Sequence, residues 1–267
     1  MRSLSDLMNL SGRKALVTGG AGHLGLAVGE ALGELGARLA ILDIDEVGCE
    51  KRAGELSRFG PGRAVAIPCD LSDERATRRA LREVIEELGG LDIIVHCAAY
   101  VGTTAAAGWS VPFQRQEVAA WDAAMKINLT SVFVIAQEAG ETLAASGRGS
   151  VILISSIYGL AGPDMRLYEG TEMGNPAGYH ASKGGLLQLT RYLSTVLAPR
   201  VRVNAISPGG VRRGQPEVFH QRYVDRTPLG RMACEEDVKG AVAYLAGDLS
   251  SYVTGHNLVV DGGWTAW

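Results

Sequence analysis

The chain has 267 residues, of which 46% are hydrophobic and 21% charged, and its formal net charge is −3. This composition excludes a disordered chain, and the small negative charge gives no electrostatic reason to expect nucleic acid or an anionic membrane as a partner. Four scattered cysteines without a CxxC spacing indicate reduced thiols, so we expect neither a disulfide framework nor a metal site. With no signal-peptide pattern and no run approaching about 18 apolar residues, we predict a cytoplasmic protein without a membrane span.

Short apolar runs and amphipathic helical segments alternate from one end of the chain to the other. The predicted strands are residues 14–18, 38–43, 64–67, 91–96, 150–155, 201–206 and 257–260. The predicted helices follow them at residues 24–35, 46–58, 73–88, 121–144, 178–197 and 235–245. Apolar strands that alternate with helices predict an α/β fold with a doubly wound parallel sheet of the Rossmann type, with about seven strands. We predict one domain, residues 1–267, because no linker or internal repeat interrupts the pattern.

A glycine-rich turn lies between the first strand and the first helix. Residues 18–25 read Thr-Gly-Gly-Ala-Gly-His-Leu-Gly. Glycines at this place let backbone N–H groups approach a pyrophosphate at the start of a helix, so the turn predicts nucleotide binding. Gly19, His23, Leu24 and Gly25 are the candidate contacts. The alternative is a turn with only a structural role.

Two acidic residues follow the next two strands. Asp43 ends the second strand, 18 residues after Gly25, where a carboxylate can bind the adenosine ribose and repel a 2′-phosphate. This position predicts NAD rather than NADP, although Asp43 could also cap the next helix. Asp70, followed by Leu71, could contact adenine or cap the helix that begins near residue 73, and the sequence leaves both possibilities open.

Tyr179 and Lys183 are four residues apart in a predicted helix, so their side chains share one face. A tyrosine with a pKa of about 10 is a poor acid or base at neutral pH, and a nearby ammonium group would lower that pKa. The strand that should lie beside this helix ends in Ser155-Ser156. These residues predict a proton-transfer site.

Taken together, these motifs resemble the single-domain branch of the short-chain dehydrogenase/reductase family. The segments that carry the resemblance are residues 18–25, Asp70-Leu71, Asn128, Ser155-Ser156, residues 179–183, Ser207-Pro208-Gly209 and residues 254–263. The resemblance implies that Tyr179 is the general acid/base, that Lys183 lowers its pKa and holds the nicotinamide ribose, and that Asn128 holds a proton-relaying water. It implies that one of the two serines, in the family's usual pattern Ser156, binds the substrate oxygen. Further cofactor contacts implied by the resemblance are Cys97, Ala98, Gly209 and Val211.

The sequence also departs from the family's pattern. His23 replaces a glycine, so the turn has the TGxxGxxG spacing of the two-domain sugar-nucleotide branch, and the Asn-rich turn after the fourth strand is His96-Cys97-Ala98-Ala99. Arg213, preceded by Arg212, stands where a threonine is usual. The two arginines could cap loop carbonyls or bind an anion.

Ser156 and Tyr179 are 23 residues apart, more than is usual in the family, which indicates an insert at about residues 160–177. The insert contains Arg166, Tyr168, Glu169 and Glu172, which suit a hydroxyl-rich or charged substrate, but it could be a surface loop without function. The insert and the Ser-Ser-Ile-Tyr-Gly run are similar to members linked to surface-sugar and nonulosonic-acid pathways.

We therefore expect an NAD-dependent enzyme that interconverts a secondary alcohol and a ketone on a sugar, polyol or related substrate. The alternatives are a sugar-nucleotide epimerase or dehydratase that recycles NAD, and an inactive NAD-binding protein. Long helices with apolar residues beyond one stripe, namely Phe133, Ile135, Leu186 and Leu189, predict a homotetramer, or at least a dimer.

Overall fold

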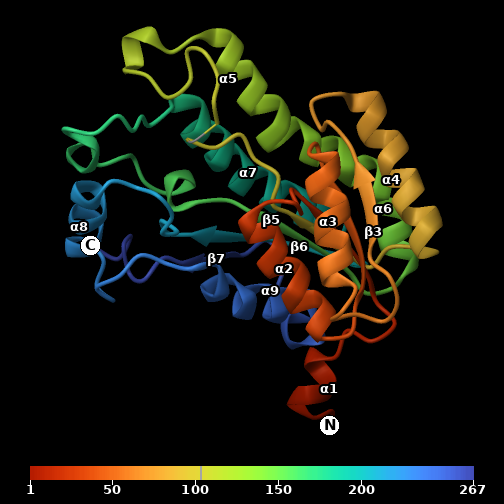
Figure 1. Ribbon diagram of the computed structural model, residues 1–267. Helices are drawn as coiled ribbons and strands as arrows, with labels where there is room; N and C mark the ends of the chain where they lie inside the picture. The colour runs from red at the N-terminus through yellow and green to blue at the C-terminus, as the bar shows by residue number, and fades with distance from the viewer. Residues whose placement is uncertain (103) are drawn as a thin grey trace.

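The computed structural model describes residues 1–102 and 104–267, so Thr103, in the predicted Gly102–Ser110 loop, lies outside the described residues. Seven parallel strands form one sheet in the order β3-β2-β1-β4-β5-β6-β7, which confirms the predicted doubly wound fold (Figure 1). The strands are β1 (Lys14–Thr18), β2 (Arg38–Asp43), β3 (Val65–Pro68), β4 (Ile93–His96), β5 (Gly149–Ile154), β6 (Val201–Pro208) and β7 (Asn257–Val260).

The strand order reverses between β1 and β4. The chain runs from β1 outward through β2 to β3, then returns to β4 on the other side of β1 and continues to β7. Thr18 at the end of β1 pairs with His96 at the end of β4. In an open sheet of this kind, ligands bind in the crevice beyond the carboxyl ends of the strands at such a reversal.

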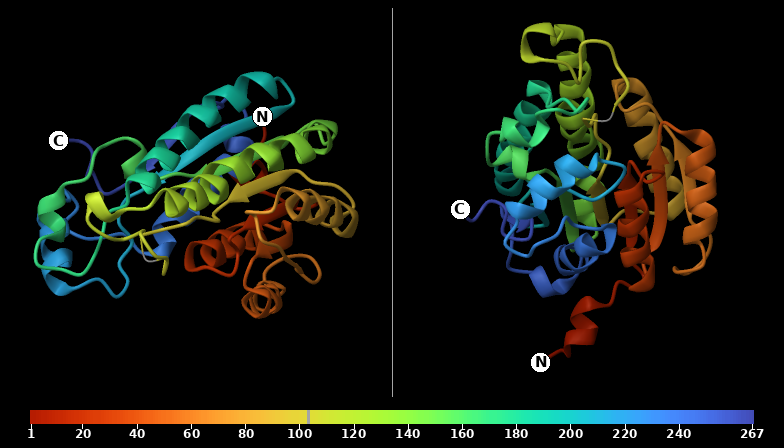
Figure 2. Two further views of the ribbon diagram at one scale, coloured as in Figure 1. Left: turned by 90° about the horizontal axis from the view of Figure 1, so that it is seen from above. Right: turned by 60° about the vertical axis from the view of Figure 1, so that its left-hand side comes forward.

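Helices cover both faces of the sheet, and two separate apolar clusters fill the layers (Figures 1 and 2). The helices of the first layer are α4 (Glu74–Leu88), α6 (Ser131–Ala145) and α7 (Ala177–Val196). The helices of the second layer are α2 (His23–Glu34), α3 (Glu46–Leu56) and α9 (Lys239–Ala246). Leu16 and Ile94 face the first cluster, whereas Val17 and Val95 face the second, as the two-residue period of a strand requires.

The predicted helix 121–144 is three consecutive segments. Helix α5 (Val118–Met125) leads through a π-helical turn, Lys126–Thr130, into α6. By length and composition alone, the whole stretch Val118–Ala145 could cross a membrane, although the sequence analysis expected no such segment. Its α6 part, however, packs against the sheet, where nine of its fifteen residues are buried. An apolar core helix accounts for this composition.

Three of the four residues predicted to lie outside the core belong to it. Ile135 and Leu186 are buried in the cluster around α6 and α7, and Leu189 packs against that cluster. Only Phe133 is exposed. The sequence period was ambiguous here because each helix is covered on more than one side, α6 by the sheet and α4, and α7 by the sheet and α5.

Two helices were not predicted. Helix α1 (Leu4–Met8) has only five residues, held by a capping box between Ser3 and Asp6. Helix α8 (Glu217–Asp225) buries only Phe219 and Tyr223, too few residues to make an apolar period visible in the sequence.

Candidate active site

The glycine-rich turn is built by close backbone approaches. A Cβ atom on Gly19, which has φ of +65°, would lie 2.5 Å from the Ala98 nitrogen, and one on Gly25 would lie 2.2 Å from the Gly19 oxygen. Gly22 is the N-cap of α2, so the unpaired N–H groups of the first helical turn face the crevice between β1 and β4. His23 is exposed and Leu24 half-buried in this first turn. The structure thus contains the cradle that a pyrophosphate requires.

Asp43 lies beside this cradle. Its carboxylate accepts hydrogen bonds from the backbone N–H groups of Ala21 (3.0 Å) and Asp45 (3.1 Å). It does not cap α3, because Asp45 is the N-cap residue and accepts from Gly48. Asp43 therefore joins the end of β2 to the glycine-rich turn, and this contact holds its carboxylate at the edge of the crevice.

Asp70 does not cap a helix either. Asp73 is the N-cap of α4, whereas the exposed Asp70 accepts only from the nearby Ser72 N–H (2.8 Å). The side chain of Leu71 is buried in the core beneath this turn. The helix cap is therefore Asp73, and the contact of Asp70 with adenine stays a prediction.

Helix α7 brings Tyr179 and Lys183 together at its amino end. The Lys183 ammonium lies 5.7 Å from the centre of the Tyr179 ring and donates a hydrogen bond to the Ile154 carbonyl at the end of β5 (2.7 Å). Lys183 is only 2% exposed. Burial lowers the pKa of Lys183 to about 8, because the charged form loses its hydration.

The acidity of Tyr179 differs from the expectation based on Lys183 alone. Burial raises the pKa of Tyr179, and a hydrogen bond with the Ser156 side chain acts in the opposite direction. The Lys183 ammonium lies over the ring and donates to the Ile154 carbonyl, whereas the group that lowers the tyrosine pKa in this structure is the Ser156 side chain.

The two serines after β5 have different partners. The Ser155 hydroxyl donates to the Lys183 carbonyl (3.0 Å) and so ties β5 to α7. The Ser156 hydroxyl accepts from the Tyr158 N–H (3.1 Å) and also interacts with Tyr179. Of the two serines, Ser156 is therefore the one that contacts the phenol, and its contact with the substrate oxygen stays a prediction.

Asn128 lies in the π-helical turn and is fully buried. Its Oδ1 accepts from the Tyr100 N–H (2.6 Å), and its Nδ2 donates to the Tyr100 carbonyl (3.1 Å) and to Ser182 Oγ (2.9 Å). These partners are distant in sequence, so Asn128 is not a helix residue satisfied locally. Both amide protons are in use, and the side chain fixes α7 to the loop after β4.

The turn after β4 contributes a buried histidine. His96 Nδ1 bonds to Thr18 Oγ1 (2.9 Å), and its Nε2 has no hydrogen-bond partner among the described residues. Burial, with a smaller effect of the Lys183 charge, lowers the pKa of His96 to about 3, so the imidazole is neutral. Cys97 and Ala98 follow it beside the glycine-rich turn, and burial raises the pKa of the Cys97 thiol to about 12.

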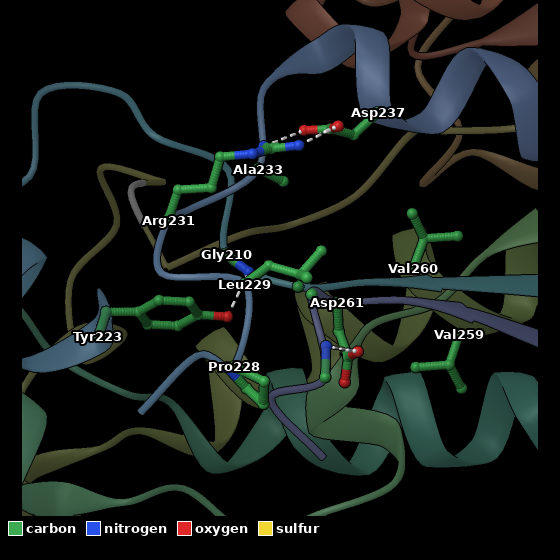
Figure 3. A pocket seen from close by; sticks show the side chains of 13 residues that line it. Gly210, Tyr223, Pro228, Leu229, Arg231, Ala233, Asp237, Val259, Val260 and Asp261 are labelled. Carbon is green, nitrogen blue, oxygen red and sulfur yellow. Dashed lines mark hydrogen bonds and ion pairs between the residues drawn. The ribbon is translucent and has the colours of Figure 1, made fainter. Parts of the chain in front are cut away.

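The loop after β6 lies at the other side of the crevice. Gly209 and Gly210 of this loop line a cavity of about 440 Å³. Figure 3 shows its lining side chains, among which the Tyr223 hydroxyl accepts from the Gly210 N–H (2.5 Å). A Cβ atom on Gly209 would lie 2.9 Å from the Asp261 Cα, so the loop packs closely on the C-terminal segment. Val211 forms a parallel bridge with Ala233.

Arg212 and Arg213 pair with acidic side chains in this structure, and anion binding by them stays a prediction. Each forms an ion pair with a carboxylate, Arg212 with Glu217 (3.7 Å) and Arg213 with Glu235 (3.3 Å). Their charges are thereby offset at the protein surface, and no carbonyl is capped by either side chain among the described contacts.

The insert forms one side of a cavity of about 1250 Å³ next to α7. Four hydrogen-bonded side chains on this side, which we call the polar wall, are Tyr158, Tyr168, Asn175 and His180. The two tyrosine hydroxyls are 2.6 Å apart, Asn175 Nδ2 donates to Tyr168 (3.0 Å), and Asn175 Oδ1 bonds to His180 Nε2.

The polar wall reaches the proton-transfer site through Tyr158, whose ring lies edge-on to Tyr179 with centroids 6.5 Å apart. Tyr179 and Ser156 themselves do not line the cavity. The sequence analysis named Tyr168, included Tyr158 only within the Ser-Ser-Ile-Tyr-Gly run, and did not single out Asn175 or His180. The position of His180 directly after Tyr179 was the one available signal, because adjacent helix residues point in directions about 100° apart.

A doubly wound sheet with a glycine cradle at its reversal and a Ser, Tyr and Lys cluster beside it defines a class of one-domain, dinucleotide-dependent oxidoreductases. The chain belongs to the short-chain dehydrogenase/reductase family: residues 19–265 match the family model described as enoyl-(acyl carrier protein) reductase.

Similar proteins span nearly the whole chain. Cis-4-hydroxycyclohexanecarboxylate dehydrogenase from Sinomonas cyclohexanicum is 34% identical over 95% of this chain and 97% of its own length. Galactitol 2-dehydrogenase (L-tagatose-forming) from Cereibacter sphaeroides is 32% identical over 98% of both chains. A short-chain dehydrogenase from Leptospira borgpetersenii, solved with bound NAD+, has a TM-score of 0.84, 30% identity, and coverage of 99% of this chain and 96% of its own.

Proposed function

We propose that the protein is an NAD-dependent dehydrogenase that interconverts a secondary alcohol and a ketone on a small hydroxylated substrate such as a sugar, a polyol or a cyclic alcohol. The observation that carries the proposal is the cluster of Ser156, Tyr179 and the buried Lys183 beside the glycine cradle. These are the groups needed to bind a hydroxyl, move its proton and hold a dinucleotide next to it.

The cofactor would lie across the carboxyl ends of β1 and β4. The turn at Gly19 and Gly25 would receive a pyrophosphate on its backbone N–H groups, and its close backbone packing requires glycine, since a Cβ atom at either position would lie 2.5 Å or less from another backbone atom. Asp43 would accept hydrogen bonds from the adenosine ribose, and Asp70 with Leu71 would flank the adenine. At the other end, Lys183 would bind the nicotinamide ribose.

The other proposed cofactor contacts lie on the elements that border the crevice. Cys97 and Ala98 lie beside the glycine cradle, Gly209 and Val211 lie on the opposite loop, and His23 and Leu24 lie at the start of α2. The nicotinamide cofactor, when bound, supplies the hydride acceptor or donor.

In the oxidation direction, the Tyr179 phenolate would take the proton of the substrate hydroxyl while Ser156 donates a hydrogen bond to the same oxygen. In reduction, the Tyr179 phenol would return that proton. The Ser156 hydrogen bond lowers the pKa of Tyr179 and so opposes the effect of burial. Asn128 would keep α7 in register with the loop after β4, so that the pair of Tyr179 and Lys183 stays aligned.

The proposed substrate class rests on two supports. Two similar proteins are named for oxidation of a hydroxylated ring acid and of a polyol. In this chain, the polar wall presents hydroxyl, amide and imidazole groups next to the Tyr179 helix, and such groups pair with substrate hydroxyls.

A screen of sugars, polyols, cyclic alcohols and simple secondary alcohols, each with NAD and NADP in parallel, tests the proposal. We expect reduced cofactor to appear at 340 nm with at least one hydroxylated substrate and NAD. Turnover of only simple alcohols would refute the substrate class, and absence of any dehydrogenase activity would refute the function. Tightly bound, non-exchanging NAD would instead favour an epimerase or dehydratase.

We also propose a cytoplasmic homotetramer. Exposed apolar side chains gather on the helices that contain Asn128 and Tyr179, namely Val118, Trp121, Phe133, Tyr192 and Val196. Several exposed apolar side chains on neighbouring helices are typical of a subunit interface. Light scattering at micromolar concentration should give about four times the mass of one chain, and a stable monomer would contradict the assembly.

A further inference from the structure

The insert is bound to α8, a helix that lies next to it although the two are far apart in sequence (Figures 1 and 2). Arg222 of α8 donates from Nη1 to three carbonyls of the insert, those of Arg166 (3.2 Å), Leu167 (3.5 Å) and Glu169 (2.6 Å). These carbonyls belong to the 3-10 turn Met165–Tyr168 and to the residue directly after it. One guanidinium therefore gathers backbone acceptors that a short turn leaves unpaired.

A second arginine binds the start of the same turn. Arg226, the C-cap of α8, forms an ion pair with Asp164, which is the N-cap of the 3-10 turn and whose side chain is 12% exposed. The bidentate contact with Arg166, together with Arg226, lowers the pKa of Asp164 to about 2. Arg226 also lies over the Trp264 ring (4.8 Å), so its own position is fixed.

Arg222 and Arg226 are four residues apart and thus adjacent on α8. Together they hold both ends of the turn. The apolar side chains of Leu167, Phe219 and Tyr223 also pack in one cluster between the turn and α8. We call the insert and α8, joined by these contacts, the insert–α8 unit. Its two sides cannot move independently without breaking charged hydrogen bonds.

The unit touches the proposed reaction site at two points. Tyr168, packed on Phe219 with ring centroids 5.3 Å apart, bonds to Tyr158, which is two residues after Ser156. On the other side, the Tyr223 hydroxyl accepts from the Gly210 N–H in the loop proposed to contact the cofactor (Figure 3). The polar wall is therefore placed relative to Ser156 by α8 as well as by the insert's own chain.

We propose that Arg222 and Arg226 are specificity-determining positioning residues, which hold the polar wall in place and thereby set which alcohols the enzyme accepts. The two arginines do not touch the reacting atoms. Their loss changes how well a substrate fits against Tyr179, while the cofactor cradle at β1 and β4 is left intact. The inference rests on the proposed oxidoreductase function for its activity measurement only. Whether α8 holds the insert can be measured by hydrogen exchange, without turnover.

The test compares Arg222→Gln and Arg226→Gln with the wild-type protein, using Arg222→Lys and Arg226→Lys as conservative variants. Arg82→Gln is the matched control, because Arg82 forms a similar ion pair between helices, with Glu138 at 2.7 Å, which joins α4 to α6 and does not involve the insert or α8. For each variant, three quantities are measured: hydrogen exchange of residues 162–176, the dissociation constant of NAD, and kcat and KM for the two best substrates of the screen, whatever their class.

We expect both glutamine variants to speed exchange across residues 162–176 by about tenfold or more, because charged hydrogen bonds are lost. The ratio of kcat/KM between the two substrates should change by about tenfold, mainly through KM, with unchanged NAD affinity. The lysine variants should recover part of both effects, and Arg82→Gln should show neither.

Two results would overturn the inference. Unchanged exchange in the insert would show that α8 does not hold it. Faster exchange with an unchanged substrate ratio, or an equal loss for every substrate, would show that the contact is structural only. Failure of the proposed function would look different, since no substrate of the screen would then be oxidised by the wild-type protein, and the exchange experiment would still decide whether α8 holds the insert.

Discussion

The cofactor crevice and the polar wall are built in opposite ways. The crevice is made of backbone: at Gly19 and Gly25 the chain passes so close to itself that a single added carbon would lie 2.5 Å or less from another backbone atom. The wall is made of side chains, held by hydrogen bonds between rings, an amide and two arginines from another helix. A backbone site tolerates almost no change, whereas a side-chain site can be altered in steps, so variation in substrate choice should arise in the wall.

The largest effect that this comparison predicts is that of Gly25→Ala. Its Cβ would lie 2.2 Å from the Gly19 oxygen, so the turn must shift and the cradle is lost. We expect NAD affinity to fall by at least about 100-fold and the free energy of unfolding by about 1–3 kcal/mol. NAD titration and thermal unfolding measure both. Gly54→Ala on α3, where no atom lies within 4 Å of the added carbon, is the control, and near-normal NAD binding by Gly25→Ala would contradict the backbone account.

The second-largest effect is expected for Lys183→Met. The ammonium is proposed to serve both the cofactor and Tyr179, so turnover should fall by about 100-fold and NAD affinity by about tenfold. Steady-state kinetics and NAD titration separate the two effects. Lys126→Met, which removes an exposed ammonium in the π-helical turn, should change neither. A Lys183 variant with normal NAD affinity would remove the lysine from the cofactor site.

Ser156→Ala tests the group that opposes the effect of burial on Tyr179. Loss of a donor to the substrate oxygen should lower the oxidation rate by about 100-fold. Oxidation requires the phenolate, so its rate rises with pH through the tyrosine pKa. Because the Ser156 hydrogen bond lowers that pKa, its removal should move this rise to higher pH.

The matched variant for this pH profile is Ser155→Ala, since the Ser155 hydroxyl bonds only to the Lys183 carbonyl. It should leave the position of the rise unchanged. A profile that is identical in wild-type and Ser156→Ala proteins would show that Ser156 does not lower the pKa of the titrating base.

The smallest effect concerns cofactor choice. Asp43→Ala should reduce the preference for NAD over NADP by about tenfold, because the carboxylate that repels a 2′-phosphate is lost. Titration with both cofactors gives the ratio. Asp45→Ala removes the cap of α3 instead and should cost about 1 kcal/mol of stability without changing that ratio. Tighter binding of NADP than NAD by the wild-type protein would refute the preference.

The same contrast explains what could be predicted from the sequence. The sheet, the glycine turn and the pair of Tyr179 and Lys183 were predictable, because they depend on local periods and short spacings. Helix α8 and its contacts with the insert were not, because Arg222 and Arg226 are 53 to 62 residues away from their partners in the sequence. The function of Asn128 was similarly hidden, since its partners Tyr100 and Ser182 are distant in sequence.

The acidity of Tyr179 was also beyond the sequence. Its i,i+4 spacing from Lys183 suggested that the ammonium lowers the tyrosine pKa, but spacing does not reveal burial or which acceptor the ammonium chooses. The Lys183 ammonium donates a hydrogen bond to the Ile154 carbonyl, and the Ser156 side chain forms the hydrogen bond with the Tyr179 phenol.

The most direct test of the account is Tyr179→Phe, measured with purified protein that is free of host dehydrogenases. The ring remains and only the hydroxyl is lost, so we expect NAD affinity to stay within about twofold of the wild-type value and turnover to fall by at least about 100-fold at every pH. Substantial turnover with NAD bound as in the wild-type protein would contradict the account, and would move the acid/base function to another group in the crevice, such as His96.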